Sequence, residues 1–185
     1  MGRRIGIDID DTLGVFISDF LDFYNELKRT NFRLEDIYTL PIREVLGLTE
    51  KEERVWFDAY NEKFPLTEGK TIRGTIEVIN KLHRQGDYLM AVTGRSEQIK
   101  EKTQLWLDQK YSGKISELHC KPHGIRKAEM KLRLDVIVED NSDEALAFAE
   151  AGVRTYLLDY PWNRKVDSRE NIVRVCSWEE LGRIL

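Results

Sequence analysis

The amino-acid sequence predicts an α/β protein in which a parallel, Rossmann-like sheet lies between two layers of helices, with a small helical cap inserted after the first strand. From residue 71 onward, short β-branched apolar segments alternate with amphipathic helical segments, and this alternation favours parallel strands joined by right-handed crossovers. Residues 14–70 show helical periodicity only and are far longer than a crossover needs. We therefore expect a core domain of residues 1–13 and 71–185 and a helical cap of residues 14–70.

The first strand is expected at residues 4–7, because a continuous β-branched run indicates a strand buried on both faces. In the insertion, aromatic and aliphatic residues recur at helical spacing: Phe16, Phe20, Phe23, Tyr24 and Leu27. Thr49 and Glu52 form a capping box that begins a second helix, which Phe64-Pro65 ends. The apolar side of this second helix carries Val55, Trp56, Ala59 and Tyr60.

The second half of the chain continues the alternation. Strands are expected at residues 88–92, 115–119, 136–138, 153–158 and 172–175. One helix is expected to carry the apolar stripe Ile72, Ile76, Ile79 and Leu82, and a second begins after Ser96 and carries Ile99, Leu105 and Trp106. Further helices are expected at residues 125–134 and 142–151 and after Ser177. Because the cap begins directly after the first strand, we expect it to cover the carboxyl end of that strand.

The composition excludes several classes of function. The net charge is −4, and both signs are interspersed along the chain without a basic stripe, so we expect no nucleic-acid polymer as partner. No apolar stretch is long enough to span a membrane, and the N-terminus continues directly into the first strand without a signal peptide. The two cysteines, Cys120 and Cys176, form no disulfide framework, which favours a cytoplasmic location.

Charge appears abruptly where the first strand ends. Asp8 and Asp10 are two residues apart in an extended segment, so their carboxylates point to the same side. In an open α/β sheet, ligands bind at this carboxyl edge. One carboxylate can attack a substrate or hold a metal while the other moves a proton. Asp11 is expected to face solvent or the cap rather than to take part in catalysis.

Three more features fall at predicted strand ends or helix starts: Thr93-Gly94-Arg95, Arg126-Lys127 and Glu139-Asp140. With Asp8-Ile9-Asp10-Asp11-Thr12, they resemble, in order, the four motifs of the haloacid dehalogenase-like (HAD) hydrolases. The resemblance implies phosphoryl transfer that depends on Mg²⁺. The acid at Asp10 favours a phosphatase or phosphomutase over a dehalogenase.

The resemblance also implies a role for each residue. Asp8 is the expected nucleophile and forms an aspartyl-phosphate, while Asp10 protonates the leaving group and then activates water. Phosphate is expected to bind at Thr93, Gly94 and Lys127, with Lys121 as the alternative lysine. Mg²⁺ is expected at Asp8, Asp140, Glu139 and Asp10, the last through its backbone carbonyl.

A closer resemblance links residues 137–141 and 157–163 to nucleotidases of the 5'(3')-deoxyribonucleotidase type. It implies a small phosphate ester as partner, of the class of nucleoside or deoxynucleoside monophosphates. Phosphatase action on another metabolite, such as a sugar phosphate, and a non-catalytic phosphate-binding role stay open, as does a homodimer formed through the cap. The sequence also leaves three details open. Arg95 contacts either phosphate or a surface partner, and Asn141 either bonds the nearby carboxylates or does not. Tyr160 and Trp162 either pack in the core or shape the pocket rim.

Overall fold

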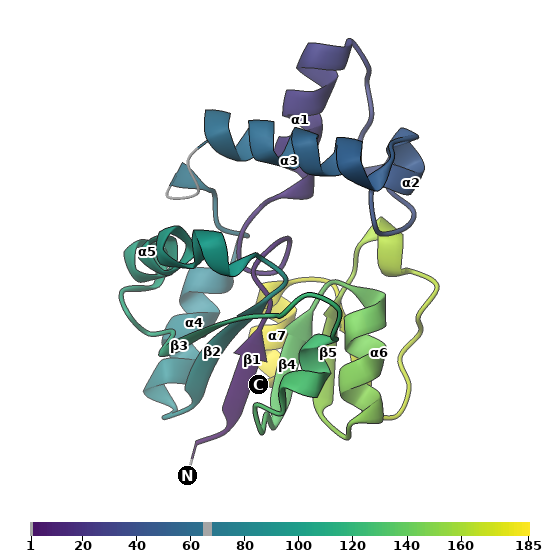
Figure 1. Ribbon diagram of the computed structural model, residues 1–185. Coiled ribbons are helices and arrows are strands. Elements are labelled where there is room, and N and C mark those ends of the chain that lie inside the picture. The colour runs from purple at the N-terminus through teal and green to yellow at the C-terminus, as the bar shows by residue number, and fades with distance from the viewer. Residues whose placement is uncertain (1, 65–67) are drawn as a thin grey trace.

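The computed structural model describes residues 2–64 and 68–185 (Figure 1). Its sheet has six parallel strands in the order β3-β2-β1-β4-β5-β6. The strands are β1 (Arg4–Ile7), β2 (Tyr88–Thr93), β3 (Glu117–Cys120), β4 (Val136–Glu139), β5 (Arg154–Leu158) and β6 (Ile172–Val175). The predicted α/β class with a parallel Rossmann-like sheet is therefore confirmed.

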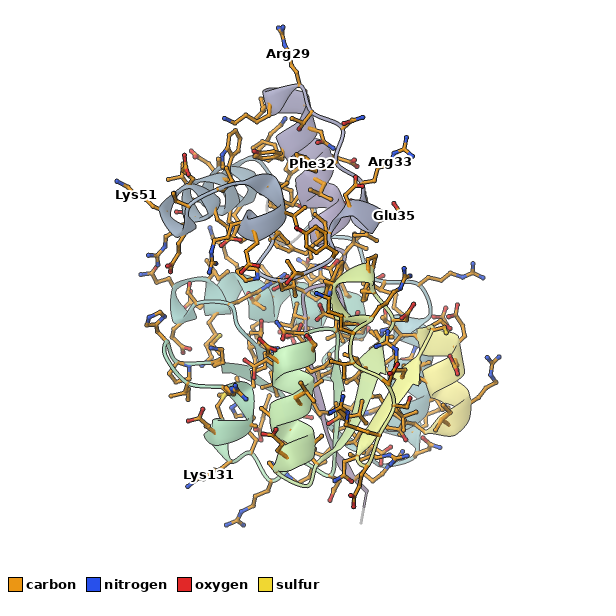
Figure 2. All side chains as sticks on the ribbon, turned by 90° about the vertical axis from the view of Figure 1, so that its right-hand side faces the viewer. Arg29, Phe32, Arg33, Glu35, Lys51 and Lys131 are labelled. Carbon is orange, nitrogen blue, oxygen red and sulfur yellow. The ribbon has the colours of Figure 1, made fainter. Side chains whose placement is uncertain are left out.

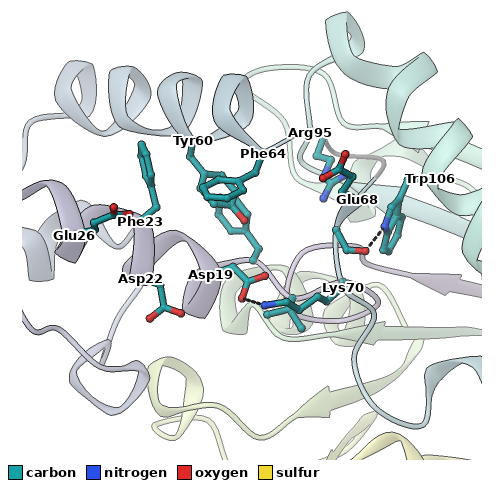
Figure 3. A pocket seen from close by; sticks show the side chains of 14 residues that line it. Asp19, Asp22, Phe23, Glu26, Tyr60, Phe64, Glu68, Lys70, Arg95 and Trp106 are labelled. Carbon is teal, nitrogen blue, oxygen red and sulfur yellow. Dashed lines mark hydrogen bonds and ion pairs between the residues drawn. The ribbon is translucent and has the colours of Figure 1, made fainter.

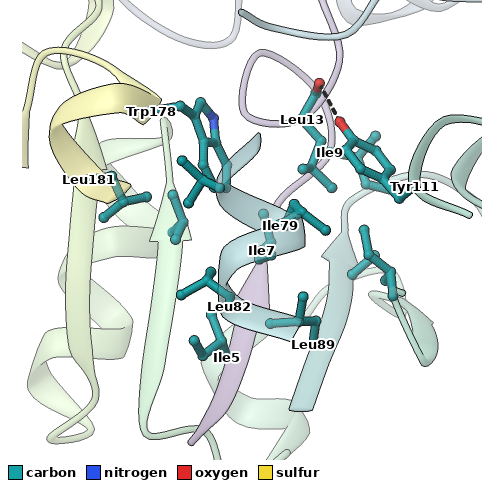
Figure 4. Packing of buried hydrophobic residues seen from close by; sticks show 14 of the residues in the cluster. Ile5, Ile7, Ile9, Leu13, Ile79, Leu82, Leu89, Tyr111, Trp178 and Leu181 are labelled. Atoms are coloured by element: carbon teal, nitrogen blue, oxygen red, sulfur yellow. Dashed lines mark hydrogen bonds between the residues drawn. The ribbon is translucent and has the colours of Figure 1, made fainter. Parts of the chain in front are cut away.

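Helices cover both faces of the sheet. On one face, α4 (Thr75–Arg84), α5 (Lys100–Tyr111) and α7 (Trp178–Ile184) pack against Ile5 and Ile7 of β1 (Figure 4). On the other face, α6 (Ser142–Glu150) and the 3-10 helix η4 (Lys127–Met130) pack over Ile137 and Val92. The strands are buried because both faces meet helices, which explains their continuous apolar sequence.

The register of β1 determines what gathers at the carboxyl edge. Ile7 pairs with Ala91 of β2 and with Val138 of β4. Asp8, which follows Ile7, and Glu139, the last residue of β4, therefore lie side by side at this edge, and the Asp8 amide donates to the Val138 carbonyl at 3.0 Å. The polar ends of neighbouring strands consequently meet at one place.

The described residues of the proposed cap, 14–64 and 68–70, lie above this edge in Figure 1. Its helices are α1 (Ile17–Lys28), α2 (Arg43–Leu46) and α3 (Glu50–Lys63), with a 3-10 turn, η1 (Leu34–Asp36), between α1 and α2. Phe20 and Tyr24 of α1 pack edge-on against Phe57 and Trp56 of α3, in an apolar core that Trp162 of the sheet domain also joins. Figure 2 shows the charged side chains of Arg29, Arg33 and Lys51 pointing outward from it.

Some local predictions were wrong. Residues 125–134 form only the short η4, because Lys131 and Arg133 adopt positive φ angles of 53° and 54°, which end helical geometry. In the helices, Leu27 and Val55 are 54% and 59% exposed, since each falls at the margin of its apolar stripe. The Thr49–Glu52 capping box is confirmed, and the predicted helix end at Pro65 lies outside the described residues.

Candidate active site

Asp8 is buried where β1 ends, with only 5% of its surface exposed. The chain turns sharply after it: the Ile9 carbonyl accepts hydrogen bonds from the amides of Leu13 and Gly14 at 2.9 and 2.8 Å. Asp11 has a φ of 53° in this turn. The tight turn holds Asp8 and Asp10 at the edge of the sheet and directs the chain upward into α1.

Three buried carboxylates meet beside β1. One oxygen each from Asp8, Glu139 and Asp140 lies within 4.8 Å of the other two. Burial raises the pKa of all three groups, that of Glu139 to about 8, and for Asp140 the charges of Asp8 and Glu139 raise it further. A cluster of this kind requires positive charge to keep it ionised. Its hard oxygen donors match the ligands that Mg²⁺ prefers, so the residues present fit the implied metal.

Lys127 supplies one positive charge. Its Nζ donates to Asp8 Oδ1 and to Glu139 Oε1, both at 2.6 Å, and the side chain is 5% exposed. Burial lowers the pKa of Lys127, but the two carboxylates outweigh burial and hold the pKa above its ordinary value. Lys121, the alternative lysine, instead donates to the backbone carbonyl of Ile125 at 2.7 Å.

Asp140 is held from several sides. Its Oδ1 accepts from the Thr12 hydroxyl at 3.3 Å and its Oδ2 from the indole Nε1 of Trp162 at 3.1 Å. The side chain of Asn163 donates to its backbone carbonyl at 2.6 Å. The Asn141 side chain does not bond these carboxylates; it accepts from the Asp143 amide at 2.9 Å and caps α6.

Asp10 lies outside the cluster of three carboxylates. Its carboxylate accepts hydrogen bonds from Arg95 Nη2 at 2.6 Å and from Arg95 Nε at 3.0 Å, and the Arg95 side chain is 12% exposed. Arg95 therefore forms an ion pair at the site rather than on the surface. The Arg95 amide also donates to the hydroxyl of Thr93, which is fully buried at the end of β2.

Asp11, expected to face solvent or the cap, is buried at the start of the first cap helix. Its carboxylate accepts hydrogen bonds from the amides of Phe16 and Ile17 at the start of α1, at 3.1 Å each. Burial raises the pKa of Asp11 to about 7. It faces the proposed cap and not solvent, and it links the acidic turn to the first cap helix.

A cavity of about 610 Å³ opens between the sheet edge and the proposed cap. From the sheet side it is lined by Asp8, Asp10, Gly94, Lys121, Lys127 and Asp140. From the cap side it is lined by Phe16, Ile17, Leu40, Ile42, Arg43 and Phe57. The predicted catalytic and phosphate-binding residues, apart from Thr93, thus line one cavity, and the cap side of this cavity combines apolar side chains with the ion pair of Arg43 and Glu53.

A second cavity of about 330 Å³ lies between α1, α3 and segment 68–70 (Figure 3). Asp19, paired with Lys70 at 2.9 Å, lines it together with Tyr60 and Trp106. None of the three clustered carboxylates lines this cavity, but Phe16 lines both cavities, and Arg95, which pairs with Asp10, lines this one. No helix among the described residues is both long and apolar enough to cross a membrane.

Comparison with known proteins identifies a family for the chain. Residues 3–185 match the family described as 5' nucleotidase, deoxy (pyrimidine), cytosolic type C protein. A nucleotidase of Clostridium acetobutylicum is 29% identical over an alignment of 185 positions, which covers 98% of this chain and 93% of that protein.

Solved structures show the same fold. A haloacid dehalogenase-like hydrolase of Streptococcus pneumoniae is similar with a TM-score of 0.68 at 13% identity, covering 100% of this chain and 99% of that one. The Bacillus subtilis protein YfnB, solved with magnesium bound, has a TM-score of 0.61 at 17% identity, covering 99% and 98%. The chain therefore belongs to the cytosolic type C 5' nucleotidase family, has the HAD-like fold, and is an enzyme of the phosphatase and nucleotidase class.

Proposed function

We propose that the enzyme hydrolyses nucleoside or deoxynucleoside monophosphates in a Mg²⁺-dependent reaction through an aspartyl-phosphate on Asp8. One observation carries the proposal: Asp8 is buried at the base of the 610 Å³ cavity, bonded to Lys127 and clustered with Glu139 and Asp140. A nucleophile, a fixed cation and a set of hard oxygen ligands are what phosphomonoester hydrolysis needs at one point.

Two chemical steps follow from this arrangement. A carboxylate oxygen of Asp8 attacks phosphorus, the ester P–O bond breaks, and Asp10 gives its proton to the leaving oxygen. Asp10, now ionised, takes a proton from water, whose oxygen attacks the phosphorus of the aspartyl-phosphate. Inorganic phosphate leaves and the Asp8 carboxylate is regenerated. Both carboxylates line the same cavity, two residues apart.

Charge balance assigns the remaining roles. A phosphate dianion that enters the cavity meets buried carboxylates, so it is repelled unless positive charge compensates. Lys127 provides that charge beside Asp8, and Thr93 and Gly94 at the end of β2 complete the proposed phosphate site. Asp8, Glu139 and Asp140 would hold Mg²⁺, with the backbone carbonyl of Asp10 as a further ligand. When bound, the metal polarises the phosphoryl oxygens and offsets their charge.

The cap side of the cavity supports the nucleotide class. Phe16 and Phe57 line it, and their rings are 5.3 Å apart and inclined at 62°. Aromatic faces of this kind suit a flat base, and a volume of about 610 Å³ falls in the range of small-molecule sites. We propose that the phosphate lies toward Lys127 and the base toward these aromatic rings.

The test is phosphate release from a panel of nucleoside and deoxynucleoside 5'- and 3'-monophosphates and sugar phosphates, with Mg²⁺ and with EDTA. We expect metal-dependent release from nucleotides and none from the Asp8→Asn variant, whose fold should be intact. Phe57→Ala should raise KM for the nucleotide, whereas Val55→Ala, on the exposed side of the same helix, should not. Release only from sugar phosphates would replace the substrate class, and silence on the whole panel would favour a binding role.

A further inference from the structure

Trp162 lies where the proposed cap meets the acidic cluster. It belongs to the short 3-10 helix η5 (Pro161–Asn163), which follows β5 in the sheet domain. Its ring is nevertheless 4% exposed and packs in the apolar core of the proposed cap. The other buried members of that cluster come from the proposed cap itself: Ile17, Phe20, Leu21, Phe23, Tyr24, Ile37, Ile42 and Leu46.

The polar atom of the same ring points the other way. Indole Nε1 donates to Oδ2 of Asp140 at 3.1 Å and to its backbone carbonyl at 3.2 Å. Beside it, Asn163 Nδ2 bridges the carbonyls of Asp140 and Leu158 at 2.6 and 2.7 Å. The ring of Tyr160 stacks on Trp162 with centroids 4.4 Å apart and an interplanar angle of 6°. The indole is therefore fixed on its face by Tyr160 and on its edge by Asp140.

This arrangement opposes a specific repulsion. The Asp140 carboxylate lies close to those of Asp8 and Glu139, and like charges in a buried site favour turning apart. The Trp162 N–H holds one Asp140 oxygen, and the Thr12 hydroxyl holds the other. Hydrogen bonds to a metal-ligating carboxylate orient it and set its affinity for the ion.

We propose that Trp162 is a positioning residue that aims the Asp140 carboxylate at a divalent cation, and that the proposed cap locks the indole for this purpose. The inference rests on the proposed function in one respect, namely that Asp140 is a metal ligand. A ring that only filled space in the cap would have no effect on the cation. A positioning role requires the N–H itself.

The test compares two single substitutions, Trp162→Phe and Trp106→Phe. Trp106 is the matched control because it is 2% exposed and its Nε1 donates to a backbone carbonyl, that of Gly69, at 2.9 Å, away from the acidic cluster. Each variant keeps an aromatic ring and loses one indole N–H. Binding of Mg²⁺ is measured by calorimetry without substrate, and thermal unfolding is recorded for both proteins.

We expect Trp162→Phe to raise the Kd for Mg²⁺ by about 10-fold or more, the effect of losing a partner of a metal ligand. Trp106→Phe should keep the wild-type Kd, although its melting temperature falls to a similar degree. Equal Mg²⁺ affinity in the two variants would overturn the proposal and leave Trp162 as a packing residue.

A second measurement uses the unsubstituted protein and so does not depend on how the variants fold. In ¹⁵N-labelled protein, the indole N–H resonance of Trp162 should shift as Mg²⁺ is added, whereas that of Trp106 should stay in place. An unmoved Trp162 resonance at Mg²⁺ saturation would contradict the proposal. Both measurements report Mg²⁺ binding without substrate. If Trp162 controls Mg²⁺ binding but no nucleotide is hydrolysed, the proposed substrate is wrong and this inference stands.

Discussion

Replacing Lys127 by methionine tests the electrostatic account of the site. The substitution keeps an unbranched side chain and removes the ammonium that contacts Asp8 and Glu139 at 2.6 Å. Surface ion pairs contribute little, but Lys127 is 5% exposed, so its loss leaves uncompensated buried charge. Breaking such a pair costs about 3–5 kcal/mol of unfolding free energy. The losses of unfolding free energy from the two ion pairs do not add, because a carboxylate that loses its partner can bind a proton and become neutral.

Because of this protonation, the stability lost in Lys127→Met should depend on pH. The pKa of Glu139 is raised to about 8 even with Lys127 present, and it rises further when the ammonium is removed. The folded variant therefore binds more protons than its unfolded chain, so its stability falls as pH rises. The loss relative to wild type should be largest above pH 8 and smaller at pH 6.

The assay is urea denaturation of wild type and Lys127→Met in EDTA at both pH values. Lys121→Met is the control, since Lys121 donates only to a backbone carbonyl and is partly exposed; it should remain close to wild type. Mg²⁺ should restore part of the stability of Lys127→Met by replacing the missing positive charge. A loss below about 1 kcal/mol for Lys127→Met at high pH in EDTA, the size expected for a surface ion pair, would show that Lys127 does not compensate the buried carboxylates.

Three further results are expected. Asp11→Ala should lower the unfolding free energy by about 1 kcal/mol in urea, because the start of α1 loses its acceptor, and Asp11→Asn should recover most of that loss. Burial raises the pKa of Asp87, but hydrogen bonds from Arg3 outweigh it and lower the pKa. Wild type should therefore be more stable than Asp87→Asn at neutral pH, and this difference should disappear as pH falls below about 4. Measuring the unfolding free energy of both proteins as a function of pH checks this. Arg95→Gln should lower kcat for the best nucleotide while the Kd for Mg²⁺ stays near wild type, because Arg95 holds Asp10 and not the clustered carboxylates; a changed Kd with unchanged kcat would contradict this role.

Local sequence patterns predicted the parts of the fold that depend on periodicity and strand ends. The apolar run before Asp8 and the run before Glu139 each indicated a buried strand, and parallel pairing of β1 with β4 then brings the two acids together. Lys127 could be expected near them only through the order of the motifs, since only the short η4 forms in place of the predicted helix at 125–134. Positive φ angles at Lys131 and Arg133 have no signal in residue type, because neither residue is glycine or asparagine.

Local sequence patterns could not predict which polar side chains far apart in the chain would pair. The Asp10–Arg95 pair joins residues 85 positions apart, and nothing in either segment identifies the other. The contact of Trp162 with Asp140 depends on how the loop after β5 folds back under the proposed cap. For Tyr160 and Trp162 the sequence left core packing and the pocket rim open; Trp162 packs in the cap core and also bonds the acidic cluster.

The most direct test of the central claim is to look for the phosphoryl group on Asp8. Wild-type enzyme is mixed with its best nucleotide and Mg²⁺, stopped with acid after a short time, digested, and examined by mass spectrometry. We expect a phosphoryl adduct on the peptide that contains Asp8, and neither adduct nor phosphate release in Asp8→Asn. Rapid hydrolysis by wild type without any adduct, together with turnover by Asp8→Asn, would contradict it.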